Sequence, residues 1–171
     1  IGLTTGKRET LLVNDKFQTN IPTIYAVGDV IGFPALATTS MEQGRLAVTH
    51  MFDTADLKSL ADVFPYGIYT VPEVSMVGIT EEEANASNID YGVGYSYFRD
   101  TARGKIMGDN DNGYLKLIFD KNSKVIKGVH IMGHFATELI HFGMQLVQEN
   151  KTLDHVISTV FNYPTLHDLY K

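Results

Sequence analysis

The chain has 171 residues, of which 44% are hydrophobic and 20% charged, with a net charge of −6 and no cysteine. This composition is typical of a soluble globular protein, and the acidic balance without any Lys/Arg run argues against a nucleic-acid or anionic-membrane partner. No apolar run reaches the ~18 residues of a membrane span, and the lack of cysteine excludes disulfides, thiolate zinc sites and redox-active cysteine pairs.

The first part of the chain predicts one short strand followed by one helix. Residues 23–27 (TIYAV) are β-prone and end at Gly28-Asp29. After a Gly/Pro loop, small or apolar residues recur at three- and four-residue spacing, which predicts a helix from about Leu36 to Phe52. Residues 53–65 are polar and end at a proline, so we interpret them as a linker between two domains.

The second part of the chain predicts short strands followed by two helices. Strands are expected within 66–71, 73–78, 91–98, 113–120 and 124–133, and helices over 136–150 and 152–160. Thr80, which precedes three glutamates, is expected to cap another helix, and Thr152 and Thr165 are further expected caps. The order β-β-α-β-β-β-α-α predicts an α+β fold, with an antiparallel sheet and helices on one face.

One cluster of side chains has the residue types of a metal site. His134, Glu138 and His141 are spaced so that they share one face of a helix. Their spacing differs from the HExxH pattern of metalloproteases, and no nearby residue supplies a convincing fourth ligand. We therefore interpret them as a polar helix face, and we expect no metal.

Residues 19–48 (TNIPTIYAVGDVIGFPALATTSMEQGRLAV) carry a recognisable pattern. They resemble the second flavin-binding motif of the flavoprotein disulfide reductases, a family with two dinucleotide-binding domains. The resemblance implies that Asp29 binds the ribityl chain of FAD, with Gly28 allowing a close backbone approach. It also implies that Leu36, Ala37 and Thr38 begin a helix whose N-terminal amides face the pyrimidine side of the flavin.

The same resemblance implies a domain organisation. Residues 1–52 would be the C-terminal remnant of an FAD/NAD(P)-binding region, a partial Rossmann-like segment, followed by the linker 53–65 and a dimerisation domain over 66–171. The chain opens on Ile1 rather than methionine and has no phosphate-binding glycine loop, so we expect it to be the C-terminal piece of a longer, cytoplasmic protein. We also expect a homodimer or higher homo-oligomer, with core or interface positions at Leu139, Phe142, Leu146, Val156 and Val160.

The stretch NYPTLHD, residues 162–168, bears on the reaction. In the lipoamide and glutathione reductases of this family, a histidine before the proline and a glutamate five residues later act as an acid–base pair. Tyr163 and Asp168 occupy these positions here. A phenol stays protonated at neutral pH and is a poor general base, so we assign no catalytic residue.

The stretches YAVGDVIGFPALA, ARGKIMGD, ATELIHFG and FNYPTL are similar to the soluble pyridine nucleotide transhydrogenases. That similarity implies hydride transfer between NAD(H) and NADP(H) through FAD, with no need for redox cysteines. This chain alone is expected to be inactive and without FAD. Two alternatives remain open. One is a dihydrolipoamide-dehydrogenase-like or mercuric-reductase-like enzyme, and the other is a stand-alone dimerisation module without catalysis.

Overall fold

The chain divides into two compact units, residues 1–61 and 62–171. The computed structural model describes residues 1–54, 59–108 and 113–171. Residues 55–58 of the expected linker, and residue 109 at the end of the ARGKIMGD stretch, lie outside the described residues. Each unit has its own cluster of buried apolar side chains, so each can be described by itself.

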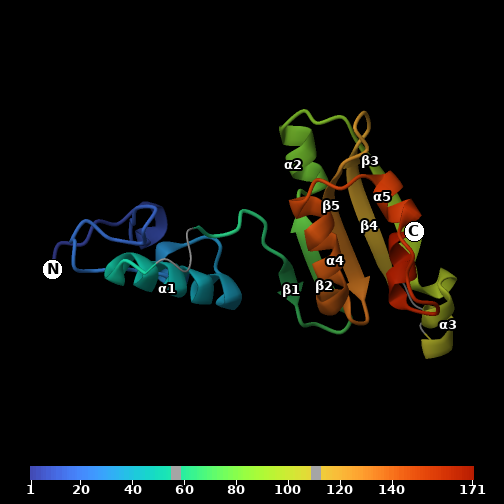
Figure 1. The fold of residues 1–171 in the computed structure, drawn as a ribbon, viewed down its shortest axis with the longest axis horizontal. Helices are drawn as coiled ribbons and strands as arrows, with labels where there is room; N and C mark the ends of the chain where they lie inside the picture. Colours follow the sequence, from blue (N-terminus) through green and yellow to red (C-terminus); the bar gives the residue numbers. More distant parts are fainter. Residues whose placement is uncertain (55–58, 109–112) are drawn as a thin grey trace. The chain divides into compact units, whose positions relative to one another are not determined.

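The main element of the unit 1–61 is a single long helix, α1 (Ala37–Phe52), which confirms the helix predicted from the sequence (Figure 1). Its buried positions recur at helical spacing, and they are Thr39, Gln43, Leu46 and Ala47. The two apolar members of this stripe pack with Phe17 to form the small core of the unit.

The strand predicted over 23–27 is wrong. Within the described residues, this run makes one isolated antiparallel bridge, between Gln18 and Tyr25. The backbone is extended at its end, with Val27 at φ −142° and ψ 162°. A strand of this buried type needs neighbouring strands to pair its N–H and C=O groups. With only the bridge available, the run passes directly into a 3-10 helix over Gly28–Ile31.

The unit 62–171 is built on a five-stranded antiparallel sheet with the order β1-β2-β5-β4-β3. Its strands are β1 (Tyr66–Ile68), β2 (Glu73–Gly78), β3 (Tyr91–Tyr97), β4 (Tyr114–Asp120) and β5 (Ile126–Gly133). Its helices are α2 (Glu81–Ala86), α3 (Ala102–Met107), α4 (Ala136–Gln148) and α5 (Leu153–Ser158), followed by a 3-10 helix over Leu166–Tyr170. This arrangement confirms the predicted α+β fold.

The core of this unit lies between one face of the sheet and the helices α4 and α5, which cover it (Figure 1). Alternation along β4 decides which side chains face the helices, because Leu115 and Leu117 are buried while Lys116 between them points to the other face. On that other face, the Lys116 Nζ lies 2.9 Å from the Glu81 Oε1 at the start of α2.

The caps predicted for two helices are confirmed, and one further capped helix was not predicted. Thr80 and Glu83 form a complete capping box at α2, and Thr152 accepts a hydrogen bond at α5, as predicted. The helix α3 was not predicted, although Thr101 caps its start and a left-handed glycine ends it. Within the described ranges, no helix is long and apolar enough to cross a bilayer.

The start of α4 is capped by a side chain from another element. The Glu73 Oε2 on β2 accepts hydrogen bonds from the Thr137 backbone N, at 3.0 Å, and from the Thr137 Oγ1, at 2.7 Å. These two donors lower the pKa of Glu73 below its ordinary value, and His134 lowers it further. Ionised Glu73 therefore ties β2 to the positive end of α4.

We expect Glu73→Ala to reduce the free energy of unfolding by about 1 kcal/mol, the usual effect of losing a helix cap. Because folding lowers the pKa of this carboxyl, its stabilisation is complete above the ordinary glutamate pKa and is lost as the pH falls through the folded-state value. Urea unfolding at several acidic pH values measures this. Glu82→Ala, an exposed glutamate in the first turn of α2, is the control. Identical pH curves for wild type and Glu73→Ala would contradict the capping role.

Candidate functional site

The turn at Gly28-Asp29 depends on a glycine. Gly28 has φ +77°, in the left-handed region, and a Cβ there would lie 3.1 Å from the Ser40 Oγ. Its backbone N donates a 2.7 Å hydrogen bond to the Oε1 of Gln43, a buried side chain on α1. Gly28 thus lets the chain turn tightly against the first two turns of α1.

Asp29 follows at the exposed end of this turn. Its backbone carbonyl accepts a 3.0 Å hydrogen bond from Gly32 N, which closes the 3-10 helix. Its side chain is exposed, and among the described residues the carboxylate has no hydrogen-bonding partner. Asp29 can therefore accept hydrogen bonds from hydroxyl groups of a bound molecule.

The N-terminus of α1 lies within the same short segment. Leu36 is its N-cap residue, and none of the residues that the structure describes caps the helix with a side chain. Ala37 and Thr38 are exposed, and the first turn contains no acidic residue. Unpaired amides at the positive end of a helix attract anions and carbonyl oxygens. The segment thus combines a left-handed glycine, an exposed carboxylate that accepts hydrogen bonds and a helix start whose amides donate them. This combination fits a flavin with its sugar-alcohol chain.

The C-terminal segment presents Tyr163 to the outside. Its side chain is 76% exposed, and it precedes a cis peptide bond to Pro164. Asp168 is half-buried in the 3-10 helix that follows. Thr165 is the N-cap residue of this helix, as predicted, but its side chain makes no capping hydrogen bond. Its Oγ1 donates a 2.8 Å hydrogen bond back to the Asn162 carbonyl, which closes the turn.

The five apolar positions that we expected in a core or interface divide into two groups. Leu139, Leu146 and Val156 are buried in the core, and Phe142 packs against it. Val160 is 91% exposed. Val160 is therefore no part of the core of this unit, and its place in an interface stays a prediction.

The polar helix face that we predicted for His134, Glu138 and His141 is formed only in part. His134 lies in the turn before α4, which begins at Ala136, while Glu138 and His141 are exposed on the helix itself. Across the described residues, no group of three or more His, Cys, Asp or Glu side chains is placed to hold a metal ion. These three residues therefore belong to a polar surface.

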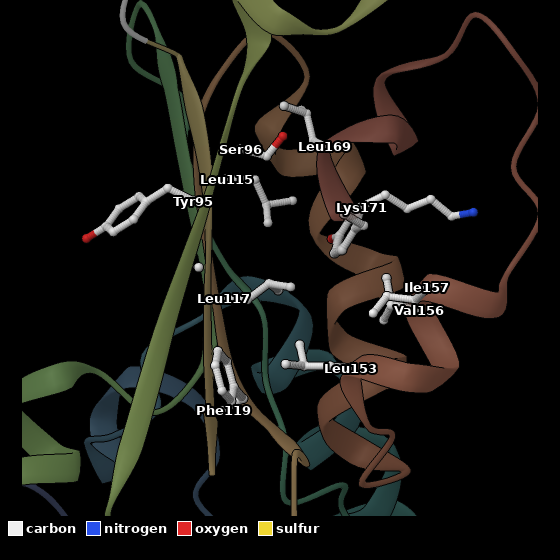
Figure 2. A pocket seen from close by; sticks show the side chains of 12 residues that line it. Tyr95, Ser96, Leu115, Leu117, Phe119, Leu153, Val156, Ile157, Leu169 and Lys171 are labelled. Carbon is white, nitrogen blue, oxygen red and sulfur yellow. The ribbon is translucent and has the colours of Figure 1, made fainter. Parts of the chain in front are cut away.

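One hollow of about 220 Å³ opens between β3–β4 and α5. Figure 2 shows Leu115 and Leu117 on its sheet side and Leu153, Val156 and Leu169 on its helix side. Its lining is mostly apolar, with Ser96, Tyr170 and Lys171 among its polar members. None of the site residues predicted from the sequence lines it, so we assign no chemistry to this hollow.

Two buried polar contacts are not predicted from the sequence. Gln43 is a buried polar residue that fixes Gly28, and its only sequence signal is an amide on the apolar stripe of α1. Tyr170 is buried, and its hydroxyl bonds to α4. No motif marks it, because its partner lies 27 and 31 residues away in sequence.

Comparisons with known proteins identify the family of the chain. Residues 64–171 match the dimerisation domain of the pyridine nucleotide-disulphide oxidoreductases, and residues 1–44 match a second model of the same family. The chain is 47% identical over 170 residues to a soluble pyridine nucleotide transhydrogenase of Mycobacterium bovis (strain BCG / Pasteur 1173P2), covering 99% of the chain and 36% of that protein. A soluble pyridine nucleotide transhydrogenase of Citrobacter koseri is 41% identical, with coverage of 100% and 37%.

Solved structures show the same fold. The crystal structure of LpdA from Mycobacterium tuberculosis matches 99% of this chain and 37% of its own, with a TM-score of 0.84 and 26% identity. The HOCl-induced flavoprotein disulfide reductase RclA from Escherichia coli has a TM-score of 0.85 at 23% identity, over 98% of this chain and 40% of its own. The chain spans little more than a third of the length of these relatives. The match over 64–171 shows that it belongs to the pyridine nucleotide-disulphide oxidoreductase family.

Proposed function

We propose that the chain is part of a cytoplasmic flavoprotein that transfers hydride between NAD(H) and NADP(H) through FAD. The observation that carries this proposal is the similarity to soluble pyridine nucleotide transhydrogenases, which extends over 99% of the chain at 47% identity. Residues 1–52 contribute the end of the FAD site, and residues 66–171 contribute the subunit interface of a homodimer or higher homo-oligomer. Residues 53–65 link the two.

When bound, FAD supplies the chemistry that accepts and donates hydride. In this chain, Asp29 accepts hydrogen bonds from the ribityl hydroxyl groups, and Gly28 allows the backbone to come close. The helix start at Leu36, Ala37 and Thr38 directs amide N–H groups toward the pyrimidine side of the flavin. The positive end of the helix dipole there stabilises the negative charge of the reduced state.

Tyr163 and Asp168 move no proton in this proposal. Hydride transfer between nucleotides by way of a flavin needs orientation and electrostatic support from the protein, and it needs no acid–base pair in this segment. Tyr163 is exposed and lies in a closed turn, and it is proposed to border the flavin site of the partner subunit. Its ring shapes that site, and its hydroxyl can donate a hydrogen bond.

The experiment is a transhydrogenation assay on the flavin-containing holoenzyme that includes this chain. NADH-driven reduction of an NADP analogue, without any disulfide substrate, is the expected result. A holoenzyme that reduces disulfide substrates and leaves the NADP analogue oxidised would contradict the proposal. The 171-residue chain alone is expected to show no flavin absorption band and to dimerise. A yellow protein would contradict the first expectation, and a strict monomer at high concentration would contradict the second.

A further inference from the structure

The hydroxyl of Tyr170 is inserted into the hydrogen-bond ladder of α4. It donates to the Leu139 carbonyl at 2.7 Å and accepts from the Gly143 N at 3.0 Å. These two backbone groups are four residues apart, the pair that an undisturbed α-helix joins directly. The Tyr170 side chain thus bridges the N–H and C=O groups of one main-chain hydrogen-bond pair in α4.

Gly143 makes room for this contact. A Cβ at this position would lie 2.9 Å from the Tyr170 hydroxyl oxygen and 3.1 Å from the Cβ of Val129 on β5. Contacts at such distances force one of the neighbours to move, and Val129 is fully buried. Gly143 and Tyr170 therefore form a matched pair, in which the missing side chain of one admits the hydroxyl of the other.

The Tyr170 hydroxyl stays in its protonated form in this contact. Tyr170 is 3% exposed, and burial raises the pKa of its hydroxyl. The group therefore stays protonated over the neutral range and remains a donor to the Leu139 carbonyl. A buried hydroxyl with both a donor and an acceptor in place fixes its surroundings in one arrangement.

The same anchor holds the segment that carries Tyr163. The Phe142 ring of α4 meets the Tyr170 ring edge-on at 5.0 Å and the Phe161 ring at 5.3 Å. Phe161 precedes the exposed turn at Tyr163, and Tyr170 follows it. Both ends of the turn are therefore packed on one residue of α4, while Tyr163 itself remains exposed.

We propose that Tyr170 is a positioning residue, whose hydroxyl sets the register of the C-terminal segment on α4 and so fixes Tyr163 at the flavin site of the partner subunit. The proposal rests on the proposed function, because the position of Tyr163 affects turnover only if Tyr163 borders that flavin site. Leu166 and Leu169 pack the segment into the core, and apolar packing of this kind has little directional preference. The two hydrogen bonds to the α4 backbone are directional, so they define the position of the segment more sharply.

The test is Tyr170→Phe in the flavin-containing holoenzyme. The ring and its contact with Phe142 remain, and the Gly143 N–H and Leu139 carbonyl can bond to each other, so the fold is expected to keep its melting temperature within a few degrees. Small misplacement of a group at a reaction site lowers turnover strongly. We expect kcat to fall by about tenfold, the KM for both nucleotides to change by less than about twofold, and hydrogen exchange over 162–168 to increase.

Two further variants make the test specific. Gly143→Ala crowds both the Tyr170 hydroxyl and the buried Val129, and it is expected to lower kcat at least as much as Tyr170→Phe does. Combining the two changes is expected to cost less than the sum of the separate losses, since they share the contact at the hydroxyl. Tyr95→Phe removes a hydroxyl from a half-exposed tyrosine that Figure 2 shows pointing away from the hollow and from Leu169, and it is expected to keep full kcat.

The possible outcomes separate this role from the proposed function. An active wild type with unchanged kcat in Tyr170→Phe overturns the positioning role alone. A fall in kcat that only follows a loss of folded protein, measured by thermal unfolding, also overturns it. A wild-type holoenzyme that transfers no hydride between the nucleotides contradicts the proposed function, and the positioning role with it.

Discussion

Gly128→Ala is expected to lower the free energy of unfolding by about 3 kcal/mol, at the upper end of what overpacking costs. A Cβ on Gly128 of β5 would lie 2.2 Å from the carbonyl oxygen of Ile79. That atom belongs to the backbone at the end of β2 and cannot rotate away as a side chain can. The substitution therefore requires two paired strands to separate.

The neighbouring contacts hold this backbone in place. Ile79 N donates a 2.9 Å hydrogen bond to the Lys127 carbonyl, and the His130 Nε2 lies 3.1 Å from the Ile79 carbonyl. Gly78, which faces Gly128 in the register, has φ +77° and equally lacks room for a side chain. A glycine within a strand often marks such a close approach of another backbone, and here both facing residues are glycine.

Gly94→Ala is the matched control for this prediction. Gly94 also lies in a strand, β3, but no heavy atom lies within 4 Å of the position that its Cβ would take. Alanine is expected to be neutral there or to stabilise the strand by about 0.5 kcal/mol. Urea unfolding at one fixed protein concentration measures both variants. If Gly128→Ala unfolds at the urea concentration of the wild type, the close approach of β2 and β5 is wrong.

The features that the sequence predicts well are those decided by nearby residues. The helix α1 follows from its apolar spacing, and the capping box at Thr80 follows from a threonine before three glutamates. The strands of the unit 62–171 follow from short β-prone runs that pair with one another inside the same unit. In each case the interactions that stabilise the element are present in this chain.

The wrong predictions have physical causes. The run 23–27 has the composition of a buried strand, but in the described residues its β-pairing is limited to the isolated bridge with Gln18, and Ile24 N bonds within a turn to the Ile21 carbonyl. Thr165 occupies the N-cap position of the last 3-10 helix, but its hydroxyl is oriented toward the Asn162 carbonyl, to which it donates, and it accepts no hydrogen bond from the helix N–H groups. The helix α3 has six residues, too short for periodicity to reveal it.

The residues of the candidate site also divide into those that a local motif reveals and those that only the packing reveals. Gly28 and Asp29 were found because they sit in a local motif, and the structure adds the left-handed backbone that explains the glycine. Gln43 and Tyr170 act on backbone groups 15 and 27 or more residues away. Contacts of that kind depend on packing, which no short stretch of one sequence records.

Asp29→Ala is expected to weaken FAD binding by the holoenzyme by about 10- to 100-fold. Hydrogen bonds to a charged group contribute about 1.5–3 kcal/mol, and about 1.4 kcal/mol corresponds to each factor of ten in affinity. The Asp29 side chain is exposed and makes no hydrogen bond with the described residues, so removing it does not disturb this unit. The loss is therefore expected in cofactor affinity and not in folding.

Titration of the FAD-free apoenzyme with FAD, followed by the quenching of flavin fluorescence, measures this affinity. Asp15→Ala removes another exposed carboxylate from the same unit and is expected to bind FAD as the wild type does. Asp29→Asn keeps one acceptor oxygen without the charge, so its affinity should lie between those of wild type and Asp29→Ala. Wild-type affinity in Asp29→Ala would mean that the Gly28-Asp29 turn serves only to direct the chain into α1, and the ribityl contact would be wrong.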